Sequence, residues 1–228
     1  MCGRFTLIAE PDSLSEIFQV WGLSNCKLSA KYNIAPTQMV LTVLYNSQSQ
    51  QREYQWLRWG LIPRWAKDSR IGARLINARA ETLTEKPSFR SAFKRRRCLV
   101  LADGFYEWKH LEGKKQPYYF HLNNKQPFAF AGLWEQWQSP GGEKIISCTI
   151  VTTNANELLQ PIHNRMPVIL QRSDYEKWLD PQLMITEPLQ ELLQPYPAEY
   201  MSAYAVSVRM NNPNLNSREC IIRKREEN

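Results

Sequence analysis

Short runs of β-branched and aromatic residues recur along most of this chain, and Gly, Asn or Pro separates one run from the next. Runs of this length and composition are typical of β-strands. The asparagine pair Asn123 and Asn124 is typical of a hairpin loop, so the two strands beside it are expected to pair. On this basis the sequence predicts seven strands: Met39–Tyr45, Glu53–Trp59, Cys98–Ala102, Phe105–Lys109, Tyr118–Leu122, Phe128–Leu133 and Ile145–Thr152.

Apolar residues at helical spacing mark fewer segments. Four of them recur on one face of the first predicted helix: Leu14, Ile17, Phe18 and Trp21. Ser13 and Glu16 have the spacing of a capping box at the start of this helix. Further helices are predicted at Ser173–Leu179, which has the same Ser-x-x-Glu start, and near Pro188–Leu193. Because the helices are scattered between the strands and do not alternate with them, the pattern favours an α+β fold with an antiparallel, barrel-like sheet core flanked by short helices.

The chain of 228 residues contains no linker, repeat or low-complexity segment that would divide it. We therefore predict a single domain over residues 1–222 and a mobile tail over residues 223–228. No apolar stretch has membrane-spanning length, and polar residues follow the start of the chain too soon for a signal peptide. A cytoplasmic monomer is expected, associated with the nucleoid if the source is bacterial.

The cysteines and histidines argue against a disulfide framework and against a metal centre. The cysteines are odd in number and form no C-x-x-C pair, and no histidines are spaced as paired ligands. We therefore expect no cofactor and no metal. The residues concerned are Cys2, Cys26, Cys98, Cys148, Cys220, His110, His121 and His163.

The net charge of +7 is unevenly spread. Residues 58–97, the basic segment, hold twelve Lys or Arg against three acids, whereas residues 171–200 hold six acids against two bases. Four aromatic residues lie within the basic segment: Trp59, Trp65, Phe89 and Phe93. Cations interleaved with aromatic rings suit a polyanion with stackable bases. For charge alone, a solvated basic helix face explains the pattern equally well.

The opening residues Met1-Cys2-Gly3-Arg4 can supply a nucleophile. Initiator methionine is normally removed when the second residue is small, which would leave Cys2 with an α-amine and a thiol on adjacent carbons. An aldehyde can condense with the amine to a Schiff base, and the thiol can then close a thiazolidine ring on the imine carbon. Taken alone, however, a cysteine near a chain end is more often incidental than reactive.

Other segments hold polar residues in positions suited to chemistry. Asn77 and Arg79 follow two apolar residues, as at a strand end that delivers polar groups to a cleft, although a strand–helix junction also explains them. Glu107 lies among aromatic residues, where burial would raise its pKa, unless strand alternation points it to solvent. His163 lies in a Pro-bounded loop and is the best candidate for a general acid or base, although most lone histidines are structural. Residues 32–37 are predicted to form a turn.

Eight motifs in these and neighbouring segments follow one another from about residue 1 to residue 213: Met1–Phe5, Tyr32–Pro36, Trp59–Pro63, Ile76–Thr82, Ala102–Trp108, Ala131–Trp134, Thr152–Asn156 and His163–Pro167. Together they resemble the SRAP (SOS response-associated peptidase) family, the abasic-site processing proteins. The motifs occur in family order and are jointly specific. The match is loose after Ser207, and nothing is carried over from Leu215 onward.

The resemblance implies a protein that binds single-stranded DNA and traps abasic sites as a thiazolidine DNA–protein crosslink through Cys2, once Met1 is removed. Autoproteolytic removal of Met1 and a weak lyase activity are also implied. Asn77, Glu107 and His163 match the family's catalytic positions. The hypothesis is that they orient the amine or the sugar, shuttle protons, and protonate the sugar oxygen, respectively. DNA contacts are expected from Arg4, Asn33, Pro36, Trp65, Arg79 and Arg165.

Two other functions fit some of the same residues. In a peptidase of the N-terminal nucleophile type, the Cys2 thiolate would attack a carbonyl, with its own amine or His163 as base. That reading leaves the basic segment unexplained. In a non-enzymatic single-strand binding module, Cys2 would be incidental, and blocking it would leave every DNA-related behaviour intact.

Overall fold

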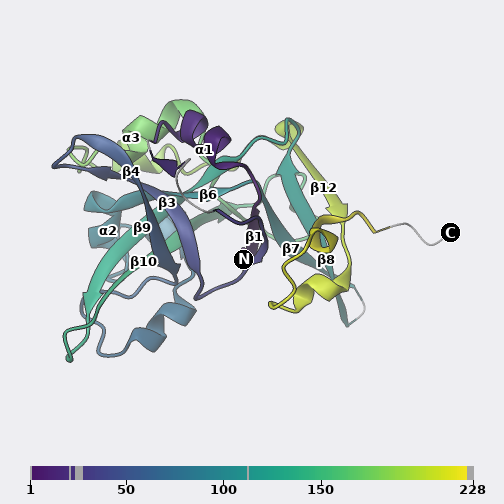
Figure 1. The fold of residues 1–228 in the computed structure, drawn as a ribbon, viewed down its shortest axis with the longest axis horizontal. Helices are drawn as coiled ribbons and strands as arrows, with labels where there is room; N and C mark the ends of the chain where they lie inside the picture. The colour runs from purple at the N-terminus through teal and green to yellow at the C-terminus, as the bar shows by residue number, and fades with distance from the viewer. Residues whose placement is uncertain (1, 21, 24–27, 112, 225–228) are drawn as a thin grey trace.

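The longest apolar strands of the chain close into a barrel, seen on the left of Figure 1. This computed structural model describes residues 2–20, 22–23, 28–111 and 113–224. The barrel strands run in the order β10-β4-β3-β6-β9, and β9 pairs back onto β10, which closes the ring. Neighbours are antiparallel except for β4 and β10, which are parallel. The five strands are β3 (Met39–Asn46), β4 (Gln51–Trp59), β6 (Arg97–Ala102), β9 (Phe128–Gln138) and β10 (Lys144–Asn154).

A second, antiparallel sheet of five strands lies beside the barrel (Figure 1). Its order is β12-β8-β7-β1-β2, with bounds β12 (Met201–Ala205), β8 (Lys114–Leu122), β7 (Gly104–Leu111), β1 (Arg4–Leu7) and β2 (Lys31–Ile34). Phe5 of β1 packs edge-on against Trp59 and Phe130 of the barrel, with ring centroids 5.1 and 5.7 Å apart. Edge-to-face contacts of buried rings stabilise beyond their burial alone. The aromatic core therefore fixes β1, and with it the start of the chain, against the barrel.

Short helices and turns cover the ends of these sheets. The helices are α1 (Pro11–Phe18), α2 (Arg90–Arg95), α3 (Tyr175–Leu179) and α4 (Glu187–Gln190). The 3-10 turns are η2 (Ser69–Arg74), η3 (Ala80–Thr82), η4 (Arg172–Asp174), η5 (Ala198–Tyr200), η6 (Val208–Asn211) and η7 (Arg218–Ile221). Phe18 of α1 stacks on Tyr175 of α3 at 5.5 Å, which joins these two helices at one end of the barrel. Two short strands, β5 (Asn77–Arg79) and β11 (Arg165–Pro167), pair with β10.

The predicted fold class is confirmed: a sheet core that includes a closed barrel, with few and short helices. All seven predicted strands are present, and each is longer than its sequence pattern indicated. Five further strands, of three to five residues each, were missed because a pattern that short carries no clear period. One of them is β2, which occupies the first residues of the segment predicted to be a turn.

The hairpin predicted at Asn123 and Asn124 is wrong. The strand before it, β8, pairs with β7 and β12, whereas the strand after it, β9, pairs with β6 and β10. The connection passes from one sheet to the other, and Lys125 within it adopts a φ of +55°. Turn composition marks a change of direction, but long-range partners decide which strands pair.

Neither predicted capping box forms. Helix α1 begins at Pro11, whose fixed φ suits the first helical position, so Ser13 lies inside the helix. Helix α3 is preceded by the turn η4, and no side chain caps it. Trp21 lies outside the described residues. Near the C-terminal end of the chain, the Lys224 N–H donates to the Ala205 carbonyl at 2.7 Å. The rest of the predicted tail, residues 225–228, lies outside the described part of the chain.

Candidate active site

Cys2 lies directly before β1 and is fully buried within the hydrophobic core. The Asn77 side-chain amide donates to the Cys2 carbonyl at 2.9 Å. Asn77 is delivered by β5, where it lies opposite Ile150 of β10. Its side-chain oxygen is buried without a hydrogen-bond partner among the described residues. Because buried polar oxygens are nearly always paired, this acceptor is available to a group that the site binds.

Glu107 reaches the same place from the second sheet. Strands β1 and β7 are antiparallel with Arg4 opposite Tyr106, so the next residue of β7, Glu107, lies level with the start of β1. Its side chain is 2% exposed. Burial raises the pKa of Glu107 to about 7, and the positive charge of the chain's amino terminus opposes the rise. A carboxyl group with this pKa can both accept and donate a proton near neutrality.

Of the two nucleophiles that Cys2 would carry, the α-amine and the thiol, the thiol is the more weakly activated. Burial raises the pKa of the thiol far above its ordinary value, and the charge of Glu107 raises it further. The thiol is therefore protonated at neutral pH. Before it can act as a nucleophile, it needs a neighbouring group to accept its proton, and Glu107 is the carboxylate whose charge it senses.

His163 lies in the loop that precedes β11 and is half-buried. His163 Nδ1 lies 3.0 Å from the Arg165 backbone nitrogen and 3.1 Å from the Arg165 carbonyl oxygen, so the ring accepts from the N–H or donates to the carbonyl according to its tautomer. Burial lowers the pKa of His163, and the charge of the amino terminus lowers it too, as does Arg165 more weakly. The same terminal charge thus acts on Glu107 and His163, which arrive from different parts of the fold.

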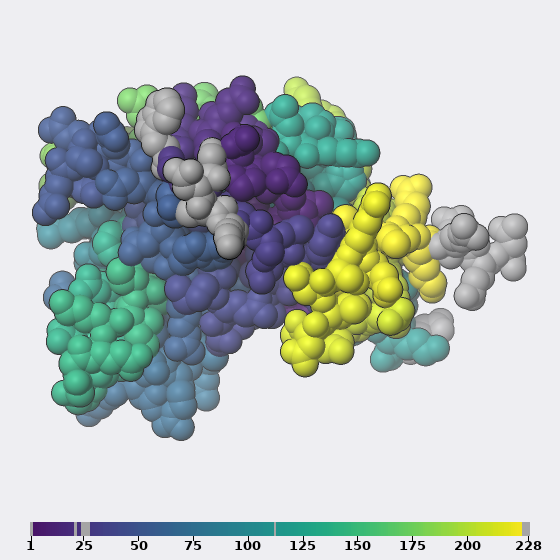
Figure 2. Space-filling model, in the orientation of Figure 1, coloured from purple at the N-terminus to yellow at the C-terminus, as the bar shows by residue number. Residues whose placement is uncertain are grey.

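Three of the residues expected to contact DNA make internal hydrogen bonds. The Arg4 guanidinium donates to Asn33 Oδ1 at 2.8 Å and to the Met210 carbonyl at 3.2 Å. The buried Asn33 amide donates to the carbonyls of Met210, Asn212 and Leu215. Figure 2 shows the consequence: the C-terminal segment, in yellow, lies directly against the dark N-terminal part. Arg165 forms an ion pair with Glu81. A DNA contact for any of the three stays a prediction.

The other expected DNA contacts lie at the surface. Arg79, at the end of β5 and two residues from Asn77, is exposed. The Trp65 side chain is 59% exposed, and Pro36 is half-buried in the turn after β2. Trp65 borders a cavity of about 670 Å³, whose other lining residues include three cations: Lys67, Arg70 and Arg74. An exposed ring beside cations is the arrangement on which single-stranded bases stack.

The basic segment is not one continuous surface. Arg97 is buried, and its guanidinium donates to backbone carbonyls that include those of Phe93 and Trp178. Burial lowers its pKa to about 10. Arg96 forms an ion pair with Glu135 at 2.7 Å. Sequence counting therefore overstated the free positive charge, because it could not show which cations satisfy acceptors inside the fold.

A network that the sequence did not reveal anchors the far end of β1. The buried Asp103 carboxylate accepts from Thr6 Oγ1 and from the backbone N–H groups of Ile8 and Ala9. Burial raises the pKa of Asp103, and these hydrogen bonds oppose the rise. The partners are more than ninety residues apart in the chain, so no local pattern could indicate them. By fixing β1, the network also fixes Cys2.

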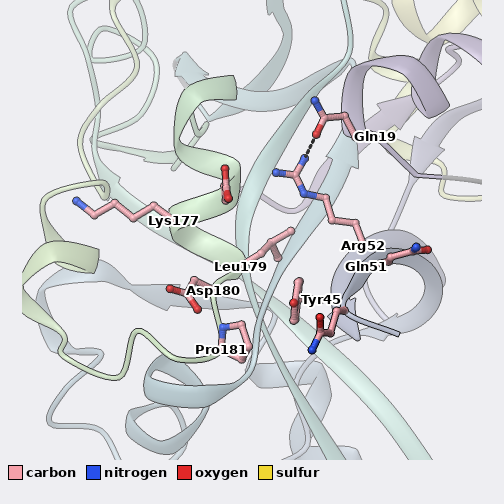
Figure 3. Close-up of a pocket in the computed structure, with 10 residues that line it drawn as sticks. Gln19, Tyr45, Gln51, Arg52, Lys177, Leu179, Asp180 and Pro181 are labelled. Carbon is pink, nitrogen blue, oxygen red and sulfur yellow. Dashed lines mark hydrogen bonds between the residues drawn. The ribbon is translucent and has the colours of Figure 1, made fainter. Parts of the chain in front are cut away.

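A separate cavity of about 660 Å³ lies between the β3–β4 hairpin and helix α3 (Figure 3). Its walls come from the β3–β4 hairpin, the end of α1 and helix α3, and the Arg52 guanidinium bonds to Gln19 Oε1 within it at 3.3 Å. Tyr45, which lines this cavity, pairs with Arg52 near the turn of the β3–β4 hairpin. At the other end of β4, the Trp59 indole N–H donates to the carbonyl of Ile76, the residue before Asn77. The cavity is thus apart from Cys2.

The described residues contain no group of three or more His, Cys, Asp or Glu side chains that could hold a metal ion. Cys2, Cys98, Cys148 and Cys220 are free thiols, and Cys26 lies outside the described residues. No helix in the described ranges is long and apolar enough to cross a membrane.

Comparison with known proteins identifies the family of the chain. A family model described as SOS response associated peptidase (SRAP) matches residues 1–213. Abasic site processing protein YoqW of Bacillus subtilis (strain 168) is 50% identical over 223 residues, which cover 97% of this chain and 99% of that protein. Abasic site processing protein HMCES of Xenopus tropicalis is 33% identical over 263 residues, covering 97% of this chain and 78% of that protein. A crystal structure of a Bacteroides thetaiotaomicron protein, 29% identical, superposes with a TM-score of 0.85 over 98% of this chain and 100% of that one. The chain therefore belongs to the SRAP family.

Proposed function

We propose that this protein processes abasic sites in single-stranded DNA by forming a covalent thiazolidine crosslink through Cys2, after removal of Met1. The observation that carries the proposal is the hydrogen bond from Asn77 to Cys2, beside a carboxyl group whose pKa is raised to about 7. The names of the relatives support the substrate, since several are called abasic site processing proteins.

The reaction needs no cofactor. The ring-opened sugar of an abasic site carries an aldehyde, and the Cys2 amine adds to its carbon and loses one water to give an imine. The Cys2 sulfur then adds to the imine carbon, while the thiol proton passes, by way of a base, to the imine nitrogen. The product is a thiazolidine ring, and the only molecule released is water. Because the thiol is buried and protonated, the amine acts first.

Each of three neighbouring side chains has a proposed step. Asn77 orients the Cys2 amine through its side-chain oxygen, which is otherwise unpaired among the described residues. Glu107 accepts the thiol proton and returns it to nitrogen, a role that suits its raised pKa. His163 protonates the sugar ring oxygen and so promotes opening to the aldehyde.

Single-stranded DNA is proposed to cross the surface that carries Arg79, Trp65 and Pro36. We expect Arg79→Ala to weaken binding of a single-stranded oligonucleotide roughly fourfold near 0.15 M salt, and to lower the slope of log affinity against log salt by about 0.7, because one phosphate contact is lost. Fluorescence anisotropy over a salt series measures both. Arg172→Ala is the matched control, because Arg172 is exposed but lies in the acidic segment. Equal slopes for the Arg79 variant and the wild type would contradict the contact.

Intact mass spectrometry tests the proposed function. The purified protein should lack Met1, and it should gain the mass of an abasic oligonucleotide, less one water, without borohydride. An oligonucleotide that contains no abasic site should give no adduct. Peptide turnover in the absence of DNA, with no adduct, would instead favour an N-terminal nucleophile peptidase. Autoproteolytic release of Met1, weak lyase activity, a monomeric state and a cytoplasmic location remain predictions.

A further inference from the structure

Glu81 and Arg165 form a bidentate ion pair close to the proposed active site. Arg165 Nη1 donates to Glu81 Oε1 at 2.6 Å, and Nη2 donates to Oε2 at 2.9 Å. The same guanidinium also donates to the side chain of Asn154 at 3.0 Å and to the carbonyl of Thr152 at 2.7 Å. Its side chain is 11% exposed. A bidentate ion pair of this kind restricts both the position and the orientation of the guanidinium.

The ion pair connects the two chain segments that carry Asn77 and His163. Glu81 belongs to η3, which continues directly from β5, and β5 begins at Asn77. Arg165 begins β11, and its backbone nitrogen and carbonyl oxygen both lie within hydrogen-bond distance of His163 Nδ1. Each segment also forms a short pairing with β10. The ion pair therefore fixes the distance between them directly.

We propose that Glu81 is a positioning residue: it holds Arg165 in place, and the Arg165 backbone in turn holds the His163 ring in one orientation. The inference rests on the proposed function for its kinetic consequence, but the ring orientation can be measured without any reaction. Without the carboxylate, a nearly buried guanidinium keeps only neutral acceptors. An unpaired buried charge is costly, so Arg165 would move toward solvent and shift the backbone groups that orient His163.

The competing role for Arg165 is a direct contact to a DNA phosphate. The two roles predict opposite effects of Glu81 on binding. If Arg165 binds phosphate, Glu81 competes with DNA for the guanidinium, and its neutralisation should strengthen binding. If the pair positions His163, neutralisation should leave non-covalent binding unchanged and slow the reaction. A misplacement of about 1 Å near reacting groups can slow a reaction on the order of 100-fold.

The test uses the full chain with Glu81→Gln, and Glu85→Gln as the matched control, since Glu85 is exposed and takes part in none of the ion pairs among the described residues. Three quantities are measured: affinity for an intact oligonucleotide, the rate of crosslinking to an abasic one, and the His163 tautomer ratio from ring ¹⁵N chemical shifts. We expect unchanged affinity, a rate about tenfold lower, and a changed ratio of the two neutral His163 tautomers for Glu81→Gln. The control variant should match the wild type, and Glu81→Asp should recover part of the rate.

Two results would overturn the proposal. One is tighter DNA binding by Glu81→Gln with an unchanged tautomer ratio, which would assign Arg165 to phosphate. The other is a wild-type tautomer ratio and rate in Glu81→Gln with unchanged binding. If the wild-type protein forms no crosslink, the proposed function fails, while the tautomer ratio of Glu81→Gln still decides the positioning role. Circular dichroism melting of each variant distinguishes a local effect from unfolding.

Discussion

Replacement of Cys2 by alanine should abolish the stable adduct with abasic DNA. The variant keeps an N-terminal amine after Met1 removal, but it has no sulfur to close the ring, so only a reversible imine can form. Intact mass spectrometry without borohydride should show no adduct mass, against near-complete conversion of the wild type. Cys2 is fully buried, and loss of its sulfur should cost about 1 kcal/mol of stability, too little to unfold the domain.

A second variant distinguishes the roles of the amine and the thiol. Cys2→Ser keeps both the amine and a group of similar shape, but its hydroxyl is a far weaker nucleophile than sulfur. Borohydride should therefore trap an imine with Cys2→Ser and with Cys2→Ala alike, while neither gives a stable adduct in its absence. A borohydride-independent adduct formed equally well by Cys2→Ala would rule out the thiazolidine.

Replacement of Glu107 by glutamine should slow crosslinking and its reversal roughly 100-fold, the usual range for loss of a general acid or base. Glutamine keeps the shape of the side chain but cannot take up the thiol proton. The wild-type rate should change with pH around 7, the pKa to which burial raises Glu107, and the variant should lack that inflection. Single-turnover rates between pH 5 and pH 9 measure both effects. Wild-type rates in both directions would remove Glu107 from the proton shuttle.

Glu107→Gln should slow the reaction but raise the stability of the folded protein relative to the wild type as pH increases. Because the folded-state pKa of Glu107 lies above its unfolded value of 4.5, the folded wild type loses stability as pH rises from about 4.5 through 7. Glutamine does not ionise, so the variant is spared this loss. Measured by urea denaturation, the free energy of unfolding of the variant relative to that of the wild type should rise by up to about 3 kcal/mol between pH 4 and pH 8. A constant difference across this range would mean that Glu107 is not ionised against a burial penalty.

Slower chemistry combined with higher stability would be diagnostic for a functional residue. A buried carboxylate that served only packing or structure would be expected to lose stability on substitution. Natural active sites commonly retain groups that lower stability because the reaction needs them. Under the proposed function Glu107 is such a group: it is buried in β7 between two aromatic residues, Tyr106 and Trp108.

The strands were visible in the sequence because their β-branched and aromatic composition, and the Gly, Asn or Pro between them, are local properties. Long strands such as β3, β9 and β10 were predicted at nearly their observed places. Their pairing was not, as the failed hairpin between β8 and β9 shows. Pairing depends on which apolar faces meet across the core, and residues such as Phe5, Trp59 and Phe130 meet only after the chain has folded.

For the site, the sequence by itself indicated which groups are available: Cys2, which would carry an aminothiol once Met1 is removed, and motifs that carry Asn77, Glu107 and His163. Tertiary structure alone decided how those groups behave. It buried the Cys2 thiol, which keeps that thiol protonated at neutral pH, and it raised the pKa of Glu107 to about 7. It also committed Arg165 to Glu81, a contact across 84 residues of chain. The sequence left open whether Glu107 is buried or faces solvent, and the packing of the folded chain decided it. No local pattern could indicate the partner of Arg165, because the two segments are far apart in the chain.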